Sequence, residues 1–186
     1  MIWLLLSCFL SKPLIETASI DSAPSDFYPV FEDCENTLES TACDFTGINS
    51  LNEKQSLYEF YKKPIVLDFS AMWCGPCNQA ASEVEELYRL YEKEDLVYLT
   101  VLIENRQGQP PTSDDIKWWL EEWGIIESPV LGSDRSLLNN GETSGWFLGG
   151  WPTFYFINKD MKIQGYLRGY SKEAVVDGIE KIIEEQ

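Results

Sequence analysis

Two cysteines separated by two residues, Cys74-Gly75-Pro76-Cys77, are the strongest chemical signal in the sequence. This spacing suits either a dithiol that exchanges with disulfides or half of a tetrahedral zinc site. A zinc site needs further ligands, but Cys34 and Cys43 are nine positions apart and the chain has no histidine. Four zinc ligands are therefore poorly specified. The pattern favours a redox dithiol and predicts no bound metal.

An apolar strand is expected before this pair and a helix after it. The run from Ile65 to Phe69 is apolar and rich in β-formers apart from Asp68, which predicts a central strand. Behind Cys77, apolar residues recur at helical spacing; they are Ala80, Val84, Leu87, Tyr88 and Tyr91. Cys74 would then stand at the helix start, where free backbone N–H groups favour a thiolate. We expect Cys74 to be the attacking sulfur and Cys77 to resolve the mixed disulfide.

Asp68 is a carboxylic acid in the middle of this apolar strand. Burying a carboxylate is costly unless its pKa rises or it is hydrogen-bonded. A raised pKa would suit a group that accepts a proton from a deep thiol. The alternative is an aspartate at an exposed end of the strand.

Further elements follow from the same patterns. The run 96–103 predicts a second central strand, and Thr112 or Ser113 is expected to cap a helix that ends at Trp123. The segments 153–157 and 162–167 predict a hairpin, and Ser171 is expected to cap a terminal helix.

At this point the residues resemble a known family. Trp73-Cys74-Gly75-Pro76-Cys77 after a strand, with Asp68 upstream and Trp151-Pro152-Thr153 far downstream, resembles the thioredoxin superfamily. The segments 42–46 and 64–67 resemble the opening of its exported TlpA/ResA-like branch, with Cys43 where that branch usually has proline. The resemblance implies an α/β, thioredoxin-like fold with a central mixed β-sheet flanked by helices. The long stretch from Cys77 to Pro152 fits the branch's extra element between the second strand and the cis-proline loop.

The resemblance also implies roles for single residues. Cys74 would be the nucleophile, Cys77 the resolving thiol and Asp68 the acid that exchanges protons with Cys77. Pro152, in a cis peptide bond, would place backbone beside the dithiol to pair with a substrate chain. ResA-like proteins often have a glutamate where this chain has Ala80, so proton transfer should fall to Asp68.

Substrate contacts are expected around the dithiol, at Trp73, Gly75, Pro76, Trp151 and Pro152. Trp151 is bulkier than the residue that usually precedes the cis proline, so we expect it to shield the dithiol and alter substrate choice. Trp73 is either an aromatic at the edge of the core or part of the contact surface.

Cys34 and Cys43 are expected to form a structural disulfide. In an oxidising compartment they would close a ten-residue loop and contribute about 2–3 kcal/mol through the unfolded state. The alternative, a second redox pair, lacks a helix start that would lower either thiol pKa.

The first ten residues are uncharged and largely apolar, too short to span a bilayer but as long as the core of a signal peptide. No lysine or arginine precedes Lys12, and Leu5-Leu6-Ser7-Cys8 resembles a bacterial lipobox with Cys8 as the lipidated residue. A lipoprotein, a secretory signal cut further on and a plain apolar N-terminus all remain open. The expected organisation is a leader at 1–20, an acidic linker at 21–41 and a thioredoxin-like domain at 42–186.

Composition excludes several other functions. The 186 residues carry 31 acidic and 14 basic side chains, a net charge of −17, which makes nucleic acid an unlikely partner. The lack of histidine excludes imidazole-based catalysis. No Walker or dinucleotide-binding motif is present, and the chemistry expected of the dithiol needs no cofactor.

The sequence thus predicts an extracytoplasmic thiol-disulfide oxidoreductase in the bacterial periplasm or cell envelope, with a lipid anchor as one alternative. Glycine and proline between the cysteines resemble reducing thioredoxins, which favours a reductase. Its partners would be cysteine-containing exported proteins and an unidentified upstream redox partner. The alternatives are a redox-inactive binding module of the same fold and a cytosolic thioredoxin.

Overall fold

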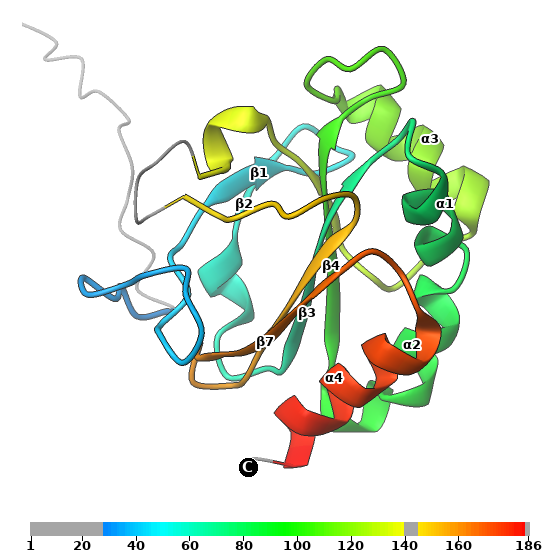
Figure 1. The fold of residues 1–186 in the computed structure, drawn as a ribbon. Helices are drawn as coiled ribbons and strands as arrows, with labels where there is room; N and C mark the ends of the chain where they lie inside the picture. The colour runs from blue at the N-terminus through cyan, green and yellow to red at the C-terminus, as the bar shows by residue number, and fades with distance from the viewer. Residues whose placement is uncertain (1–27, 140–144, 185–186) are drawn as a thin grey trace, which may run out of the picture.

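The computed structural model describes residues 28–139 and 145–184. Within these residues a mixed seven-stranded sheet has the order β2-β1-β5-β4-β3-β6-β7 (Figure 1). Cys8, the predicted leader and the first part of the predicted linker lie outside the described residues. None of the helices in the described part of the chain is long and apolar enough to cross a membrane.

The centre of the sheet is parallel and its edges are antiparallel. β4 pairs in parallel with both β3 and β5, whereas β6 and β7 on one side and β1 and β2 on the other run antiparallel to their neighbours. The strands are β1 (Thr46–Ile48), β2 (Lys54–Ser56), β3 (Ile65–Ala71), β4 (Val97–Glu104), β5 (Val130–Gly132), β6 (Thr153–Ile157) and β7 (Ile163–Arg168).

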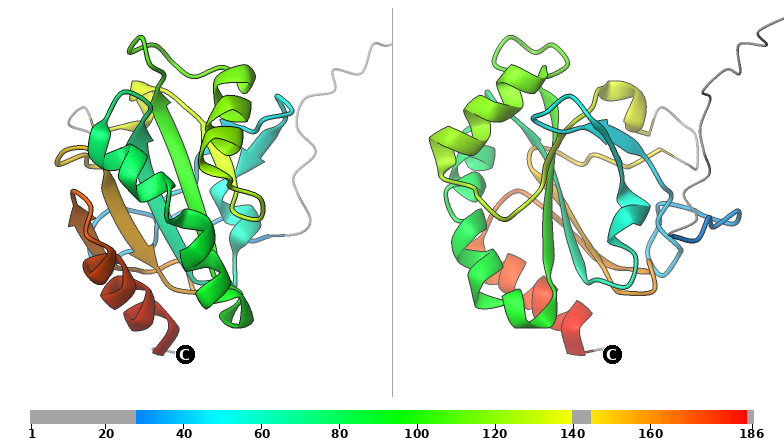
Figure 2. Two further views of the ribbon diagram at one scale, coloured as in Figure 1. Left: turned by 90° about the vertical axis from the view of Figure 1, so that its right-hand side faces the viewer. Right: turned by 180° about the vertical axis from the view of Figure 1, so that it is seen from behind.

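The α-helices share one face of the sheet (Figure 2). They are α1 (Gly75–Ala81), α2 (Val84–Leu90), α3 (Ser113–Trp123) and α4 (Lys172–Glu184). Val66, Tyr98 and Phe154 project from the strands into the core on this side. The opposite core is closed by Ala42, Phe45, the 3-10 helix η1 (Leu57–Phe60) and the loop that carries Trp146. Two shorter 3-10 helices are η2 (Glu92–Glu94) and η3 (Arg135–Leu137).

The predicted fold class is confirmed, including the extra element. β3, β4, the β6–β7 hairpin and α4 lie where the sequence patterns predict them, and Thr112 caps α3 by accepting a hydrogen bond from the Asp115 N–H. α3 and β5 form the insertion between β4 and Pro152.

The helix after the dithiol differs from the prediction, because it is divided into α1 and α2. Ser82 and Glu83 separate the two segments. The Ser82 hydroxyl donates to the Gln79 carbonyl at 2.7 Å, and a serine that bonds back to the preceding turn competes with the helical hydrogen bonds and bends the helix. Ala80, Val84 and Leu87 remain on one buried stripe.

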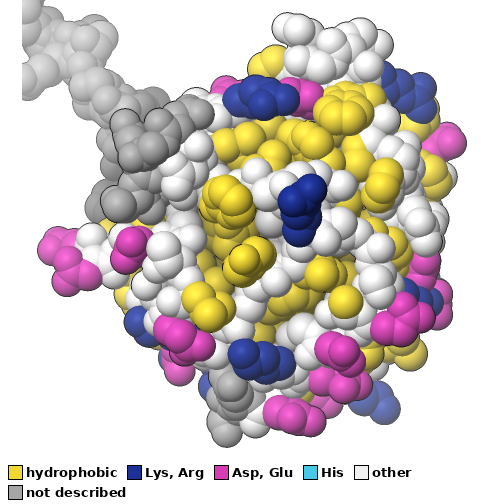
Figure 3. Space-filling view, viewed as in Figure 1, with side chains coloured by type: hydrophobic (Ala, Val, Ile, Leu, Met, Phe, Trp, Pro, Cys, Tyr) yellow, Lys and Arg dark blue, Asp and Glu magenta, His cyan; other side chains and the backbone are white. Residues whose placement is uncertain are grey.

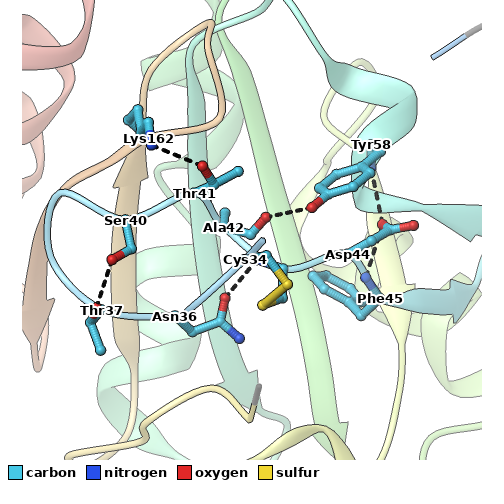
Figure 4. The surroundings of a disulfide bond; sticks show 11 residues. Cys34, Asn36, Thr37, Ser40, Thr41, Ala42, Asp44, Phe45, Tyr58 and Lys162 are labelled. Carbon is cyan, nitrogen blue, oxygen red and sulfur yellow. Dashed lines mark hydrogen bonds between the residues drawn. A yellow bond between two sulfur atoms is a disulfide. The ribbon is translucent and has the colours of Figure 1, made fainter. Parts of the chain in front are cut away.

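Cys34 and Cys43 are joined by a disulfide that secures the chain segment leading into the domain (Figure 4). The Cys43 N–H donates to Asn36 Oδ1 at 2.8 Å. Next to it, Thr41 and Lys162 form an isolated antiparallel bridge, and the Lys162 ammonium donates to the Thr41 hydroxyl at 2.9 Å. The cross-link therefore holds this segment against the beginning of β7.

Replacing both Cys34 and Cys43 by serine should lower the free energy of unfolding by about 2–3 kcal/mol, because the unfolded chain loses a ten-residue loop constraint. Urea unfolding measures this loss. The rate of insulin disulfide reduction should stay at the wild-type value, since neither residue belongs to the predicted dithiol. A normal stability with a lost reduction rate would instead identify a second redox pair.

Candidate active site

The dithiol lies at the junction between the end of β3 and the start of α1. β3 ends at Ala71, and the Cys74 N–H donates to the Ala71 carbonyl at 3.1 Å, which closes a tight turn. Cys74 is the N-cap of α1, and the Cys77 N–H donates to Cys74 Sγ at 3.2 Å. Pro76 occupies the first turn, where its missing N–H breaks no helical hydrogen bond. Cys74 and Cys77 are joined by a disulfide, so the structure holds the oxidised form.

The two sulfurs differ in access. Cys77 is fully buried, and Cys74 is 4% exposed. Trp73, Gly75 and Pro76 surround Cys74 on the exposed side. Of the two cysteines, Cys74 is therefore the one that lies nearer to the protein surface.

Two tryptophans stand side by side at this opening. The rings of Trp73 and Trp151 meet edge to face with centroids 6.1 Å apart, and Trp73 is 49% exposed. The Trp151–Pro152 peptide bond is cis, as the resemblance implies. Thr153 pairs with Phe69 near the carboxyl end of β3, which places Pro152 at the same end of the sheet as the dithiol.

Asp68 lies on the sheet face that the helices cover. It is 1% exposed and lies two residues after Val66, so the two side chains share a face of the strand, and Val66 packs in the same core as Cys77. The Ser70 hydroxyl donates to Asp68 Oδ1 at 2.7 Å, and Oδ2 has no hydrogen-bond partner among the described residues. Burial raises the Asp68 pKa to about 7, against the opposing effect of hydrogen bonding. The alternative of an exposed aspartate at a strand end is therefore wrong.

Hydroxyl groups surround this carboxyl group. Thr100 is the register partner of Asp68 on β4, and Tyr98 lies two positions earlier on the same face. Tyr170 packs against Phe154, the partner of Asp68 on β6. Burial is the main cause that raises the pKa of both Tyr98 and Tyr170, so both phenols stay protonated at neutral pH. Asp68 is then the group in this buried cluster that titrates near pH 7.

Glu104 is a residue that the sequence analysis missed. It ends β4, is 6% exposed, and accepts a hydrogen bond from Trp73 Nε1 at 2.7 Å. Its other oxygen accepts from Arg135 Nε. The predicted strand ended at Ile103, which left Glu104 in a loop. A strand one residue longer would have placed this carboxylate beside the dithiol.

The remaining predicted site residues lie elsewhere. Cys34 and Cys43 are held at the opposite end of β3, next to the β6–β7 turn. Cys8 lies outside the described residues. Within residues 28–139 and 145–184, no cluster of three or more aspartate, glutamate or cysteine side chains is arranged to hold a metal ion.

Comparison with known proteins agrees with this geometry. Residues 38–166 match the AhpC/TSA family over more than half of the chain. The chain belongs to the AhpC/TSA family. It is 26% identical over 144 residues to the thiol-disulfide oxidoreductase ResA of Geobacillus thermodenitrificans, covering 77% of this chain and 76% of ResA.

Solved structures share the fold. A protein proposed to be a thiol-disulfide oxidoreductase from Bacteroides vulgatus superposes with a TM-score of 0.62 at 26% identity, covering 79% of this chain and 97% of that one. A thioredoxin-family thiol:disulfide interchange protein from Chlorobium tepidum superposes with a TM-score of 0.61 at 19% identity, covering 77% and 95%. The predicted resemblance to the thioredoxin superfamily and its ResA-like branch is confirmed, and so is the class of enzyme, a thiol-disulfide oxidoreductase.

The raised pKa of Asp68 predicts a pH-dependent stability. In the unfolded chain its pKa is 3.8, and in the folded protein it is about 7. Between these values the folded state binds the extra proton, so wild-type stability falls as pH rises from about 4 to 7. Asp68→Asn should remove this loss, which amounts to roughly 4 kcal/mol between pH 4 and pH 8.

Denaturant unfolding of the oxidised protein at both pH values measures this difference. Asp114→Asn is the matched control, because Asp114 is an exposed carboxylate in an ion pair on α3. The control should keep the wild-type pH dependence. Identical pH dependence of wild type and Asp68→Asn would show that Asp68 is not the buried titrating group.

Proposed function

We propose that this thiol-disulfide oxidoreductase acts outside the cytoplasm as a reductase that opens disulfides in exported proteins. The observation that carries the proposal is Cys74 at the start of α1, flanked by exposed residues, next to Cys77, which is fully buried on the same side of the sheet as Asp68, a carboxylic acid with a pKa of about 7. This arrangement separates attack, resolution and proton transfer among three groups.

The reaction begins from the reduced dithiol. The Cys74 thiolate attacks one sulfur of a substrate disulfide, the substrate S–S bond breaks, and the other substrate sulfur leaves as a thiolate that takes a proton from solvent. The N–H of Cys77, which contacts Cys74 Sγ in the structure, stabilises the Cys74 thiolate before the attack.

Resolution transfers the disulfide to the enzyme. Asp68, ionised above about pH 7, accepts the proton of the Cys77 thiol, and the Cys77 thiolate attacks Cys74 Sγ. The second substrate sulfur leaves, so that the substrate gains two electrons and the enzyme dithiol loses two. A redox partner that supplies two electrons must then restore the dithiol.

Different residues support the direction of the reaction and the location of the protein in the cell. Gly75 and Pro76 between the cysteines resemble reducing thioredoxins, which favours reduction over oxidation. The apolar start of the chain and the Cys34–Cys43 disulfide favour an oxidising compartment, the periplasm or cell envelope, with Cys8 as the lipidation site. Cell fractionation with a fatty-acid label tests this location.

Two alternatives fit the residues less well. A redox-inactive binding module would have no need for both cysteines and a buried acid. A cytosolic thioredoxin would have no use for a disulfide outside its active site.

Insulin reduction distinguishes an enzyme from a binding module. Cys74→Ser should abolish reduction, because it removes the attacking sulfur. Cys77→Ser should accumulate a mixed disulfide with the substrate, visible on a non-reducing gel, because it cannot resolve the intermediate. Turnover by Cys74→Ser at the wild-type rate would refute the assignment of the nucleophile.

Asp68→Asn should slow turnover about a hundredfold at pH 8, the lower end of what a positioned base contributes. The wild-type rate should rise as pH increases through about 7, because the Asp68 carboxyl group ionises. This rise in rate should be missing in Asp68→Asn. Rates measured from pH 5.5 to 8.5 with saturating reductant test both points. Retention of the step near pH 7 in the variant would assign it to another group.

A further inference from the structure

One exposed aromatic side chain lies on β7, and another lies on the loop that leads into the cis proline. Phe147 is 54% exposed and Tyr166 is 60% exposed. They are connected through Tyr155, whose hydroxyl donates to the Phe147 carbonyl at 2.7 Å and whose ring lies 6.3 Å from that of Tyr166. Figure 3 shows apolar side chains gathered on the face over β6 and β7, with a basic side chain among them.

Arg168 occupies this surface next to the cis-proline loop. It ends β7 and pairs in register with Thr153, the residue that follows Pro152. A Cβ added at Gly150 would lie 2.9 Å from Arg168 Nε, and one added at Gly149 would lie 3.4 Å from its Cδ. The arginine side chain therefore lies over the bare backbone of Gly149 and Gly150, directly before Trp151.

The charge of Arg168 is unmatched within the described residues. The side chain is exposed and makes no hydrogen bond or ion pair with any of them. Of the other arginines, Arg89 and Arg135 each pair with a glutamate and Arg106 stacks on the ring of Trp118. An unpaired guanidinium among exposed aromatic rings is suited to a carboxylate that arrives with a partner, because it offers a planar, two-pronged set of donors.

We propose that Arg168 is a specificity-determining residue that binds an aspartate or glutamate side chain close to the disulfide cysteine of a substrate polypeptide. Apolar substrate residues around that carboxylate would pack on Phe147, Tyr166 and the Trp73–Trp151 pair. The enzyme would thus prefer disulfides flanked by acidic and apolar residues. This inference rests on the proposed reductase function and names the class of substrate for the same site.

Two disulfide-linked peptides test the proposal. They are identical except for a glutamate or a glutamine next to the cysteine, and both carry apolar residues around it. Single-turnover reduction by the reduced full-length protein at low salt gives the rate for each peptide. We expect wild type to reduce the glutamate peptide about five- to tenfold faster, and we expect added salt to diminish this preference.

Variants at one position assign the preference. Arg168→Gln should bring the ratio of the two rates close to one, and Arg168→Glu should favour a third peptide with lysine at the same place. Arg168→Lys should keep a smaller preference for glutamate, because lysine keeps the positive charge but lacks the paired N–H donors of the guanidinium group. Lys63→Gln is the matched control, since it removes an exposed positive charge just before β3, at the end of the sheet away from the dithiol; it should keep the wild-type ratio.

The outcomes separate the inference from the proposed function. Equal rates for the two peptides with wild type, or a glutamate preference that survives in Arg168→Gln with an unchanged melting temperature, would overturn the role of Arg168 alone. Failure of wild type to reduce either peptide would overturn both the reductase function and the substrate preference.

Discussion

The hydrogen bond from the Cys77 N–H to Cys74 Sγ is the contact around which the molecule is organised. It puts sulfur in the position that a serine or aspartate oxygen takes at other helix N-termini. β3 leads to Cys74 through a tight turn, and Pro76 suits the first turn of α1 because it has no N–H group that would need an acceptor. The same contact that begins the helix thus favours a thiolate at Cys74, the proposed nucleophile.

Asp68 shows that stability and the proposed proton transfer make opposite demands on one residue. A buried carboxyl group in the centre of the sheet weakens the fold at any pH where it is ionised. Its neighbours include the hydroxyls of Ser70, Thr100 and Tyr98, and no cation of the described residues lowers its pKa by charge pairing. The protein keeps an acid that titrates near neutral pH where an apolar residue would stabilise the sheet more.

Local sequence patterns were sufficient for the parts of the site that are close together in the chain. The strand, the dithiol and the helix occupy residues 65–81, and their order follows from periodicity and from the helix-start chemistry of Cys74. The position of Pro152 beside them needed the family resemblance, since no local pattern relates residues so far apart. The break at Ser82 was not predicted because serine is tolerated in helices unless its hydroxyl turns back on the chain.

Local sequence patterns could not predict contacts between elements that are far apart in the chain. Glu104 reaches Trp73 only because β4 runs one residue past the predicted strand and lies beside β3. Arg168 reads as an ordinary surface charge in the sequence. Its position over Gly149 and Gly150 depends on the register of the β6–β7 hairpin, which the spacing of apolar residues alone does not specify.

The placement of the Cys34–Cys43 bond has a consequence for a catalyst that exchanges disulfides. Its own cross-link is chemically a substrate, and a reduced molecule could in principle consume its electrons on itself. β3 separates the two sulfur pairs by its length, roughly 20 Å for seven residues, so the dithiol cannot reach the cross-link of its own chain. Within one folded molecule the dithiol and the structural cross-link therefore do not exchange, and the dithiol stays available for disulfides of other proteins.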